Sequence, residues 1–300
     1  PNARMNIFIS LVLGFSISIG LAFLLEFFDN TIKSVDFLEK KVLSILALIP
    51  SIVNQKVDKK VNMGNVQKIK RRIITREDPK SPVSEAYRSL RTSLMYSDNN
   101  RKDSNVILVS SSEPGEGKTT TIVNLAITYA NLGKKTLLID TDLRKPVIHQ
   151  VFSVSREPGI TKYLSGLENN FKNLAVETEV ENLSVITCGV VPPNPSEILA
   201  SNKMKELIES LRKDYDVILL DSPPLLAVTD SFVTMKYVDQ FILVVRSGST
   251  VKGALNRSLA QLELTNSPLT GAVLNAVDES TSYGGNYYYN YYHYYRDDNS

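Results

Sequence analysis

The chain has 300 residues, of which 43% are hydrophobic, so it can build one large domain or two small ones around a buried core. Its formal net charge of +2 excludes a strong overall field for acidic partners, and we expect no nucleic-acid partner. The single cysteine, Cys188, excludes an internal disulfide framework, fits a reducing compartment, and is interpreted as buried and structural rather than catalytic. Because the sequence begins Pro-Asn-Ala-Arg, we interpret it as a fragment of a longer polypeptide.

An apolar segment lies near the N-terminus. No charged residue stands between Met5 and Leu25, and about 20 apolar residues at about 1.5 Å rise each span the hydrocarbon of a bilayer. We therefore predict a transmembrane helix within residues 1–28. A cleavable signal peptide fits poorly, because no basic region of useful length precedes the segment and no Ala-x-Ala site follows it. A buried core helix is the remaining alternative.

The two flanks of this segment differ in charge. Arg4 stands alone before it, whereas residues 29–104 are rich in lysine and arginine. Positive charge stays on the cytoplasmic side, so we expect everything after residue 28 to be cytoplasmic. Residues 29–80 are interpreted as a juxtamembrane linker, whose basic stretch after Pro50 is either solvated or touches anionic lipid.

From Asn105 onward, short apolar runs alternate with helical stretches. The runs are continuous, as expected for strands that are covered on both faces of a sheet. This alternation predicts an α/β domain with a parallel sheet flanked by helices. The expected strands are 105–110, 135–140, 184–188, 216–221, 240–246 and 270–275, and the expected helices lie near 118–132, 196–213, 228–238 and 250–265.

A strand, a glycine-containing loop and a helix follow one another in residues 106–121. This order is the context of a phosphate-binding P-loop (Walker A motif), in which Gly115 and Gly117 let backbone amides approach phosphate. Lys118 is expected to reach the β- and γ-phosphates, and the Thr119 hydroxyl to ligate Mg²⁺. The usual first glycine of the motif is Ser112 here. The sequence therefore predicts binding of a nucleoside triphosphate with magnesium.

Acidic residues follow two of the predicted strands. Asp140 and Asp142 end one strand, and Asp221 ends another. Ligands of a parallel sheet bind beyond the carboxyl ends of its strands, so all three aspartates are expected at the same edge as the P-loop. Asp221 suits the Walker B role of holding the metal. A lone acidic residue in such a place is usually a turn or cap residue, but three beside a P-loop favour a magnesium site.

Two further sequence features are separate from the residues expected at this edge of the sheet. A helix is expected from Ser81, capped by Ser84, in which Glu85, Arg88 and Arg91 share one broad face; an exposed Glu85–Arg88 salt bridge is the simple interpretation. Near the C-terminus, residues 283–295 hold eight of the fourteen tyrosines, interspersed with Gly and Asn, and no fixed structure is expected there.

Five motifs, in this order, resemble the bacterial tyrosine kinases of capsular and exopolysaccharide synthesis. They are SEAYRSLR, SSEPGEGKTT, LLIDTDLRKP (the family's extra Walker A′ motif), VILLDSPP and the terminal tyrosine cluster. Residues 1–50 resemble the end of a chain-length-determinant (polysaccharide co-polymerase) protein, as in the fused form of the family. The resemblance implies a transmembrane helix at 1–28, a cytoplasmic juxtamembrane linker at 29–80, a P-loop kinase domain at 81–278 and a flexible tail at 279–300.

The resemblance also implies roles for individual residues, with ATP and Mg²⁺ as cofactors. Lys118, Asp140 and Asp142 are the implied catalytic residues, and the implied metal ligands are Thr119, Asp142 and Asp221. The implied nucleotide contacts are Pro114, Gly115, Glu116, Gly117, Lys118, Thr119 and Thr120. Glu85, Arg88 and Arg91 match the helix motif that joins subunits into a ring-like homo-oligomer.

The tail matches the cluster that a neighbouring subunit phosphorylates. The implied acceptors are Tyr283, Tyr287, Tyr288, Tyr289, Tyr291, Tyr292, Tyr294 and Tyr295. The implied activity is ATP-dependent protein-tyrosine kinase, which regulates polysaccharide polymerisation together with the export machinery. The implied location is the bacterial inner membrane, with the catalytic domain in the cytoplasm. A sticky low-complexity tail is the simpler interpretation of the tyrosine run.

Two other functions use the same nucleotide residues. One is a P-loop ATPase switch of the partitioning type, but Glu113 stands where those proteins carry an extra lysine. The other is an assembly factor that binds nucleotide without kinase activity. Asn275 and Arg246 are weak candidates for base contacts, since each is more often a structural cap or surface residue.

Overall fold

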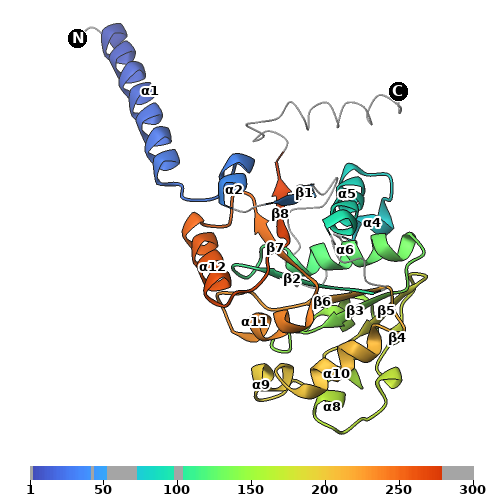
Figure 1. Ribbon diagram of the computed structural model, residues 1–300. Helices are drawn as coiled ribbons and strands as arrows, with labels where there is room; N and C mark the ends of the chain where they lie inside the picture. Colours follow the sequence, from blue (N-terminus) through green and yellow to red (C-terminus); the bar gives the residue numbers. More distant parts are fainter. Residues whose placement is uncertain (1–2, 42–43, 53–72, 98–103, 279–300) are drawn as a thin grey trace.

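The protein is described by a computed structural model that covers residues 3–41, 44–52, 73–97 and 104–278 (Figure 1). The predicted tyrosine cluster at 283–295 lies outside the described residues, as does most of the basic stretch that follows Pro50.

Eight strands form one sheet in the order β1-β8-β7-β2-β6-β3-β5-β4. All neighbouring strands are parallel except β4 and β5. The predicted α/β fold with a parallel sheet is therefore confirmed. The strands are β1 (Ile45–Pro50), β2 (Asn105–Ser111), β3 (Thr136–Asp140), β4 (Val176–Glu177), β5 (Leu183–Ile186), β6 (Val217–Asp221), β7 (Gln240–Arg246) and β8 (Gly271–Val277).

Helices cover both faces of this sheet (Figure 1). A core cluster that includes Leu90, Ile122 and Val109 packs α5 and α6 on one face, and a second cluster that includes Leu207 and Leu255 packs α10 and α12 on the other. This double covering explains why the strands are continuous apolar runs. The helices are α1 (Ala3–Phe28), α2 (Val35–Lys41), α4 (Ile74–Glu77), α5 (Pro82–Ser97), α6 (Lys118–Asn131), α7 (Ile148–Val151), α8 (Gly159–Leu164), α9 (Pro195–Leu199), α10 (Asn202–Leu211), α11 (Asp230–Thr234) and α12 (Lys252–Leu264), with 3₁₀ turns at Phe171–Asn173 and Met235–Tyr237.

Residues 45–50, which we assigned to the linker at 29–80, instead form the edge strand β1. Ile45 pairs with Ala272 and Leu48 with Leu274, so β1 extends the sheet beside β8. The side chain of Ile49 is completely buried, and the Ser93 hydroxyl of α5 donates to the carbonyl of Leu46 at 2.9 Å. The globular domain therefore begins before the expected boundary at residue 81.

Helix boundaries also differ from the prediction in two places. The helix expected at 196–213 is divided at Ala200 and Ser201 into α9 and α10. The helix α5 begins at Pro82, and Ser81 rather than Ser84 caps it, because the backbone N–H of Ser84 donates to Ser81 Oγ at 3.2 Å. Ser84 Oγ instead donates to the carbonyl of Asp78 at 2.6 Å.

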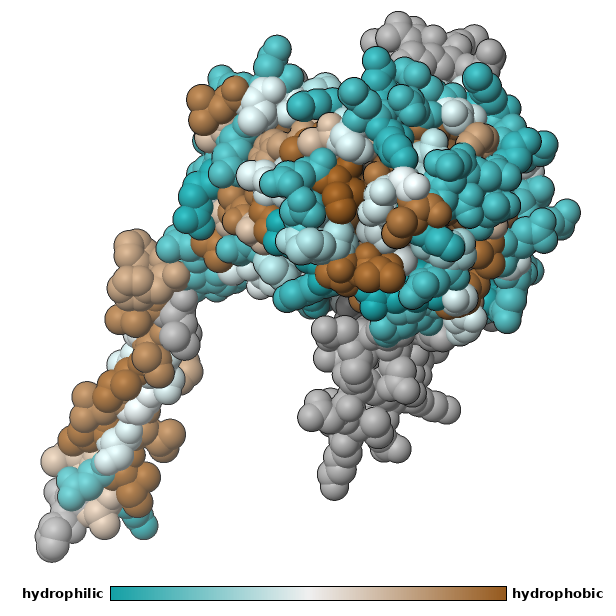
Figure 2. Space-filling model, turned by 90° about the horizontal axis from the view of Figure 1, so that it is seen from below, coloured by the Kyte–Doolittle hydropathy of each residue, from teal (hydrophilic) through white to brown (hydrophobic). Residues whose placement is uncertain are grey.

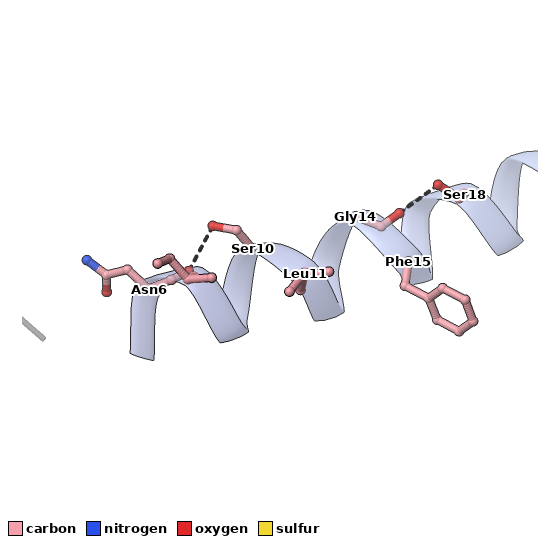
Figure 3. Close-up of a pocket in the computed structure, with 7 residues that line it drawn as sticks. Asn6, Ser10, Leu11, Gly14, Phe15 and Ser18 are labelled. Atoms are coloured by element: carbon pink, nitrogen blue, oxygen red, sulfur yellow. Dashed lines mark hydrogen bonds between the residues drawn. The ribbon is translucent and has the colours of Figure 1, made fainter. Parts of the chain in front are cut away.

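Among the described residues, α1 is the one helix that is long and apolar enough to cross a bilayer. It projects from a mainly hydrophilic body as a largely apolar rod (Figure 2). Asn6, Ser10, Gly14 and Ser18 follow one another every four residues along it (Figure 3). Ser10 Oγ donates to the carbonyl of Asn6 and Ser18 Oγ to that of Gly14, both at 2.8 Å, so both hydroxyls are satisfied within the helix, as hydrocarbon requires.

Candidate active site

The P-loop predicted at 106–121 joins the end of β2 to the start of α6. Gly115 and Gly117 have φ values of 87° and 101°, a left-handed region that glycine adopts without strain. A Cβ atom at Gly117 would lie 2.1 Å from Asn275 Nδ2, so a side chain here would displace the amide that donates to the carbonyl of Glu116. Pro114 and Gly115 are exposed, and Thr120 is buried in the first turn of α6. This 14-residue helix begins at Lys118 without a side-chain cap, and the amides of a helix N-terminus favour an anion.

Lys118 lies between two carboxylates at this edge of the sheet. Its Nζ atom is 3.1 Å from Asp142 Oδ2 and 3.4 Å from Asp221 Oδ1. Burial alone would lower the pKa of Lys118, but the charges of Asp221 and Asp142 outweigh this effect and raise the pKa. The ammonium group is therefore held protonated in the loop that binds phosphate.

Thr119 is the second P-loop side chain directed at the strand ends. Its hydroxyl donates to Asp221 Oδ2 at 2.8 Å, and both residues are buried. The structure thus brings together the hydroxyl and the carboxylate that the sequence paired as metal ligands. They come from α6 and β6, so the contact depends on the sheet and not on local sequence.

Asp140 ends β3 directly beside Asp221. Its Oδ2 atom accepts the backbone N–H groups of Val147 and Ile148, both at 3.0 Å. Its Oδ1 atom is buried and has no hydrogen-bond partner. Burial, followed by the charge of Asp221, raises the pKa of Asp140 to about 8. An unpaired buried carboxylate oxygen costs free energy, which favours a cation at this place.

The balance of acidic and basic side chains indicates whether a divalent metal fits this site. The site holds three carboxylates, from Asp140, Asp142 and Asp221, against the single ammonium of Lys118, an excess of acidic groups that a divalent cation would balance. Within the described residues, no group of three or more His, Cys, Asp or Glu side chains could enclose a metal ion. A metal here would therefore take Thr119, Asp221 and Asp142 together with phosphate oxygens and water, as Mg²⁺ usually does.

The segment after β3 is held by an ion pair that the sequence did not indicate. Arg144 donates through Nε to Asp230 Oδ2 at 3.0 Å and through Nη2 to Asp230 Oδ1 at 3.3 Å. Ser196 Oγ donates to the same buried carboxylate. This forked contact ties the Asp140–Asp142 turn to α11 and α9. Asp230 has no sequence signal of its own, because its partner is 86 residues away.

Two residues that we weighed for base contacts hold the P-loop backbone. Arg246 Nη1 donates to the carbonyl of Gly115 at 3.0 Å. Asn275 Nδ2 donates to the carbonyl of Glu116 at 2.9 Å. Arg246 is the last residue of β7 and Asn275 lies within β8, so both strands fix the shape of the loop.

The helix motif in α5 divides into two parts. Glu85 and Arg88 form the expected intrahelical ion pair, and Arg88 Nη2 also donates to the carbonyl of Pro79 at 2.6 Å. The Arg91 side chain contacts its own chain: its Nη1 donates to the carbonyl of Thr128 on α6 at 2.6 Å. The structure therefore does not bring these three residues together with the nucleotide site.

Comparison with known proteins agrees with this geometry. A family model described as an AAA domain matches residues 104–266. The tyrosine-protein kinase YwqD of Bacillus subtilis (strain 168) is 39% identical over 224 residues, which are 74% of this chain and 92% of that protein. A putative tyrosine-protein kinase in the cps region of Klebsiella pneumoniae is 32% identical over 283 residues, 92% of this chain but 38% of that longer protein. The solved BceF tyrosine kinase domain superposes with a TM-score of 0.72 at 34% identity, covering 82% of this chain and 99% of that one.

The fold and the site define a P-loop domain that binds nucleotide with a divalent metal. The chain belongs to the bacterial tyrosine-protein kinases, and the predicted protein-tyrosine kinase activity is confirmed at the level of the family.

Proposed function

We propose that the chain transfers the γ-phosphate of ATP to tyrosines 283–295 of a neighbouring copy at the cytoplasmic face of the inner membrane. The observation that carries the proposal is the position of Lys118, within 3.4 Å of carboxylates from two different strand ends. A cation and carboxylates around a phosphate-binding loop are what phosphoryl transfer requires, because it depends on positioning and charge neutralisation.

Each side chain has a task in this proposal. The Lys118 ammonium leaves its carboxylate partners to bind the β- and γ-phosphate oxygens. Thr119, Asp221 and Asp142 would hold Mg²⁺, which supplies neutralisation of phosphate charge when bound. The Asp142 side chain is 8% exposed, whereas Asp140 is completely buried. Asp142 is thus better placed to accept the proton of the tyrosine hydroxyl, and Asp140 shapes the turn through Val147 and Ile148.

The apolar helix α1 supports a membrane anchor in this proposal. Ile7, Leu11, Phe15 and Phe23 are all more than 60% exposed, a cost in water that a bilayer would remove. Residues 1–28 would then be the anchor, residues 29–41 the juxtamembrane part, residues 45–278 the kinase domain and residues 279–300 the acceptor tail. A second copy, joined through the Glu85–Arg88 face of α5, would provide the acceptor.

The name of the Klebsiella pneumoniae relative, a kinase in the cps region, supports a role in capsular or exopolysaccharide synthesis. We propose that phosphorylation of the tail regulates polysaccharide polymerisation together with the export machinery. The negative charge added by each phosphate, about −1.5 to −2, would change how neighbouring chains associate.

Incubation with ATP and Mg²⁺, followed by mass spectrometry, tests the proposal. The whole chain is purified in detergent, and phosphorylated residues are mapped with and without the change Lys118→Met. Phosphate on residues 283–295 that depends on Lys118 is the expected result. ATP hydrolysis without phosphotyrosine would instead indicate a nucleotide switch, and neither activity would indicate an assembly factor.

A further inference from the structure

The P-loop contains a carboxylate that is turned away from the phosphate site. Glu116 is 2% exposed, although the neighbouring Gly115 lies open to solvent. Its Oε2 atom accepts the backbone N–H of Glu113 at 3.1 Å, and its Oε1 atom accepts the hydroxyl of Thr250 at 2.6 Å. Burial raises the pKa of Glu116. The side chain therefore acts within the protein and not on a ligand.

A buried carboxylate in the P-loop is unfavourable for two reasons. It puts an acidic group beneath a loop that binds phosphate, and its burial costs free energy that only hydrogen bonds offset. A residue that is unfavourable in both respects is expected to serve the function of the site. What Glu116 gains in return is its contact with Thr250, 134 residues away.

The two hydrogen bonds of the Thr250 hydroxyl fix the direction of its proton. Thr250 is 1% exposed, and its Oγ1 atom accepts the backbone N–H of Arg246 at 2.8 Å. A hydroxyl has a single proton to donate, so this proton is directed at Glu116. No solvent reaches the pair to replace the contact.

We propose that Glu116 is a positioning residue, which fastens the P-loop to the turn of residues 246–250 after β7 through Thr250. Arg246 and Asn275 already hold the carbonyl groups of Gly115 and Glu116. The Glu116–Thr250 contact adds a third point of attachment, on the side-chain side of the loop. Together these contacts keep the amides of the loop aimed at phosphate before nucleotide binds, which reduces the cost of ordering the loop on binding.

The same turn is bonded from its other side to the segment that leaves the apolar helix α1. The backbone N–H of Ile32 donates to the carbonyl of Thr250 at 2.9 Å, and that of Gly248 donates to the carbonyl of Ile32 at 2.8 Å. Lys252 N–H donates to the carbonyl of Asn30 at 2.9 Å. Thr250 therefore contacts both Ile32, through its backbone carbonyl, and the P-loop, through its hydroxyl. The contact deepens the proposed function, on which it rests, by connecting the segment that follows α1 to the P-loop.

Nucleotide affinity is the measurement that tests this role, because it needs neither phosphate transfer nor an acceptor tyrosine. The full chain in detergent is titrated with a fluorescent, non-hydrolysable ATP analogue and Mg²⁺. The variants are Thr250→Val, which removes the hydroxyl at nearly constant volume, Thr250→Ser, which restores it, and Glu116→Gln. Thr265→Val is the matched control, since Thr265 lies exposed at the other end of α12 and its hydroxyl bonds only nearby groups.

The Glu116→Gln variant separates two explanations, because they predict opposite changes in the affinity for the ATP analogue. A positioning role predicts weaker binding, and an effect of the Glu116 charge alone predicts tighter binding. Loss of positioning weakens analogue binding about three- to tenfold in Thr250→Val and Glu116→Gln, the range that corresponds to the net contribution of a typical hydrogen bond. Thr250→Ser and Thr265→Val then stay within about twofold of the unchanged chain, roughly the resolution of such a comparison. If charge alone mattered, Glu116→Gln would tighten binding and Thr250→Val would leave it unchanged, which would overturn the proposal.

If the Glu116–Thr250 contact only stabilised the fold and did not position the P-loop, the measurements would differ. In that case Thr250→Val would lower the melting temperature and the fraction of chains that bind, while the dissociation constant of the remaining chains would not move. This result would also overturn the proposal, and if Thr250→Val does not fold, Thr250→Ser and Glu116→Gln still decide the outcome. Wild-type binding without phosphorylation of the tail would contradict the proposed acceptor and leave the role of Glu116 intact.

Discussion

Asp140 and Asp221 are direct partners across the adjacent parallel strands β3 and β6, and both side chains are completely buried. The hydroxyl of Thr141 donates to the backbone carbonyl of Asp221 at 2.7 Å, so the two strand ends are also joined beyond the aspartates. Two buried acidic groups in one place repel each other unless a cation lies near. Lys118 supplies part of that compensation, and the remainder makes the site suited to a divalent metal.

Removal of the Lys118 ammonium is expected to abolish phosphate transfer. Lys118→Met should lower the rate of tyrosine phosphorylation by about 100-fold or more, because a charge that neutralises the transferring phosphate is lost. Lys134→Met is the control, since Lys134 is exposed beyond the far end of the same helix. Initial rates with radiolabelled ATP measure the effect. Equal rates in both variants would remove Lys118 from the mechanism.

The ion pair of Arg144 with Asp230 is expected to hold the catalytic turn. Arg144→Ala leaves the buried Asp230 carboxylate without its main partner and should lower the free energy of unfolding by about 1–3 kcal/mol. This loss is smaller than that for a fully buried ion pair, because the Arg144 side chain is 42% exposed. The double change Arg144→Ala with Asp230→Asn should recover part of this loss. Urea unfolding measures both. A double variant that is less stable than Arg144→Ala would contradict this account.

The thiol of Cys188 is expected to be inert in the folded chain. Burial raises its pKa to about 11, and reagents attack the thiolate. Its labelling rate should therefore keep rising with pH up to about 11 instead of levelling near 9, and labelling near pH 8 should be complete only after unfolding. Because the chain has one cysteine, absorbance of released thionitrobenzoate reports this site alone. Fast labelling of folded chains at pH 8 would show that the thiol is accessible.

Arg88 and Arg91 are expected to differ in their effect on assembly. Arg91 bonds the carbonyl of Thr128 in its own chain, so Arg91→Ala should lower the free energy of unfolding by about 1–2 kcal/mol. Arg88 is half-buried at the surface of α5 and would meet a neighbouring copy, so Arg88→Ala should reduce the oligomer size. Light scattering and thermal unfolding of both variants separate these effects. Dissociation by Arg91→Ala without loss of stability would reverse the assignment.

The sequence predicted the parts of the site that local patterns define. The run from β2 through the P-loop to α6 has a fixed order of apolar residues, glycines and lysine, and the aspartates at 140 and 221 follow apolar strands. The parallel sheet then places them together without further information. These predictions depend on elements whose identity is visible within about ten residues.

The parts that the sequence did not predict depend on distant partners. Residues 45–50 form a strand only because β8 offers an open edge, so the same apolar run was taken for part of a linker. Thr250, Asp230 and Asn275 are ordinary polar residues until the fold brings Glu116, Arg144 and Gly117 beside them. Tertiary contacts of this kind leave no periodic signal in the chain.

The central claim, transfer to the tyrosine tail of another copy, is tested most directly by mixing two chains. One is the whole chain with Lys118→Met, which keeps the tail at 279–300 but lacks the phosphate-binding ammonium. The other is an active chain that ends at Asp278. Our account predicts that, with ATP and Mg²⁺, phosphate accumulates on tyrosines 283–295 of the Lys118→Met chain only when the active chain is present. Absence of phosphotyrosine in the mixture, under conditions in which the unchanged chain phosphorylates itself, would contradict it.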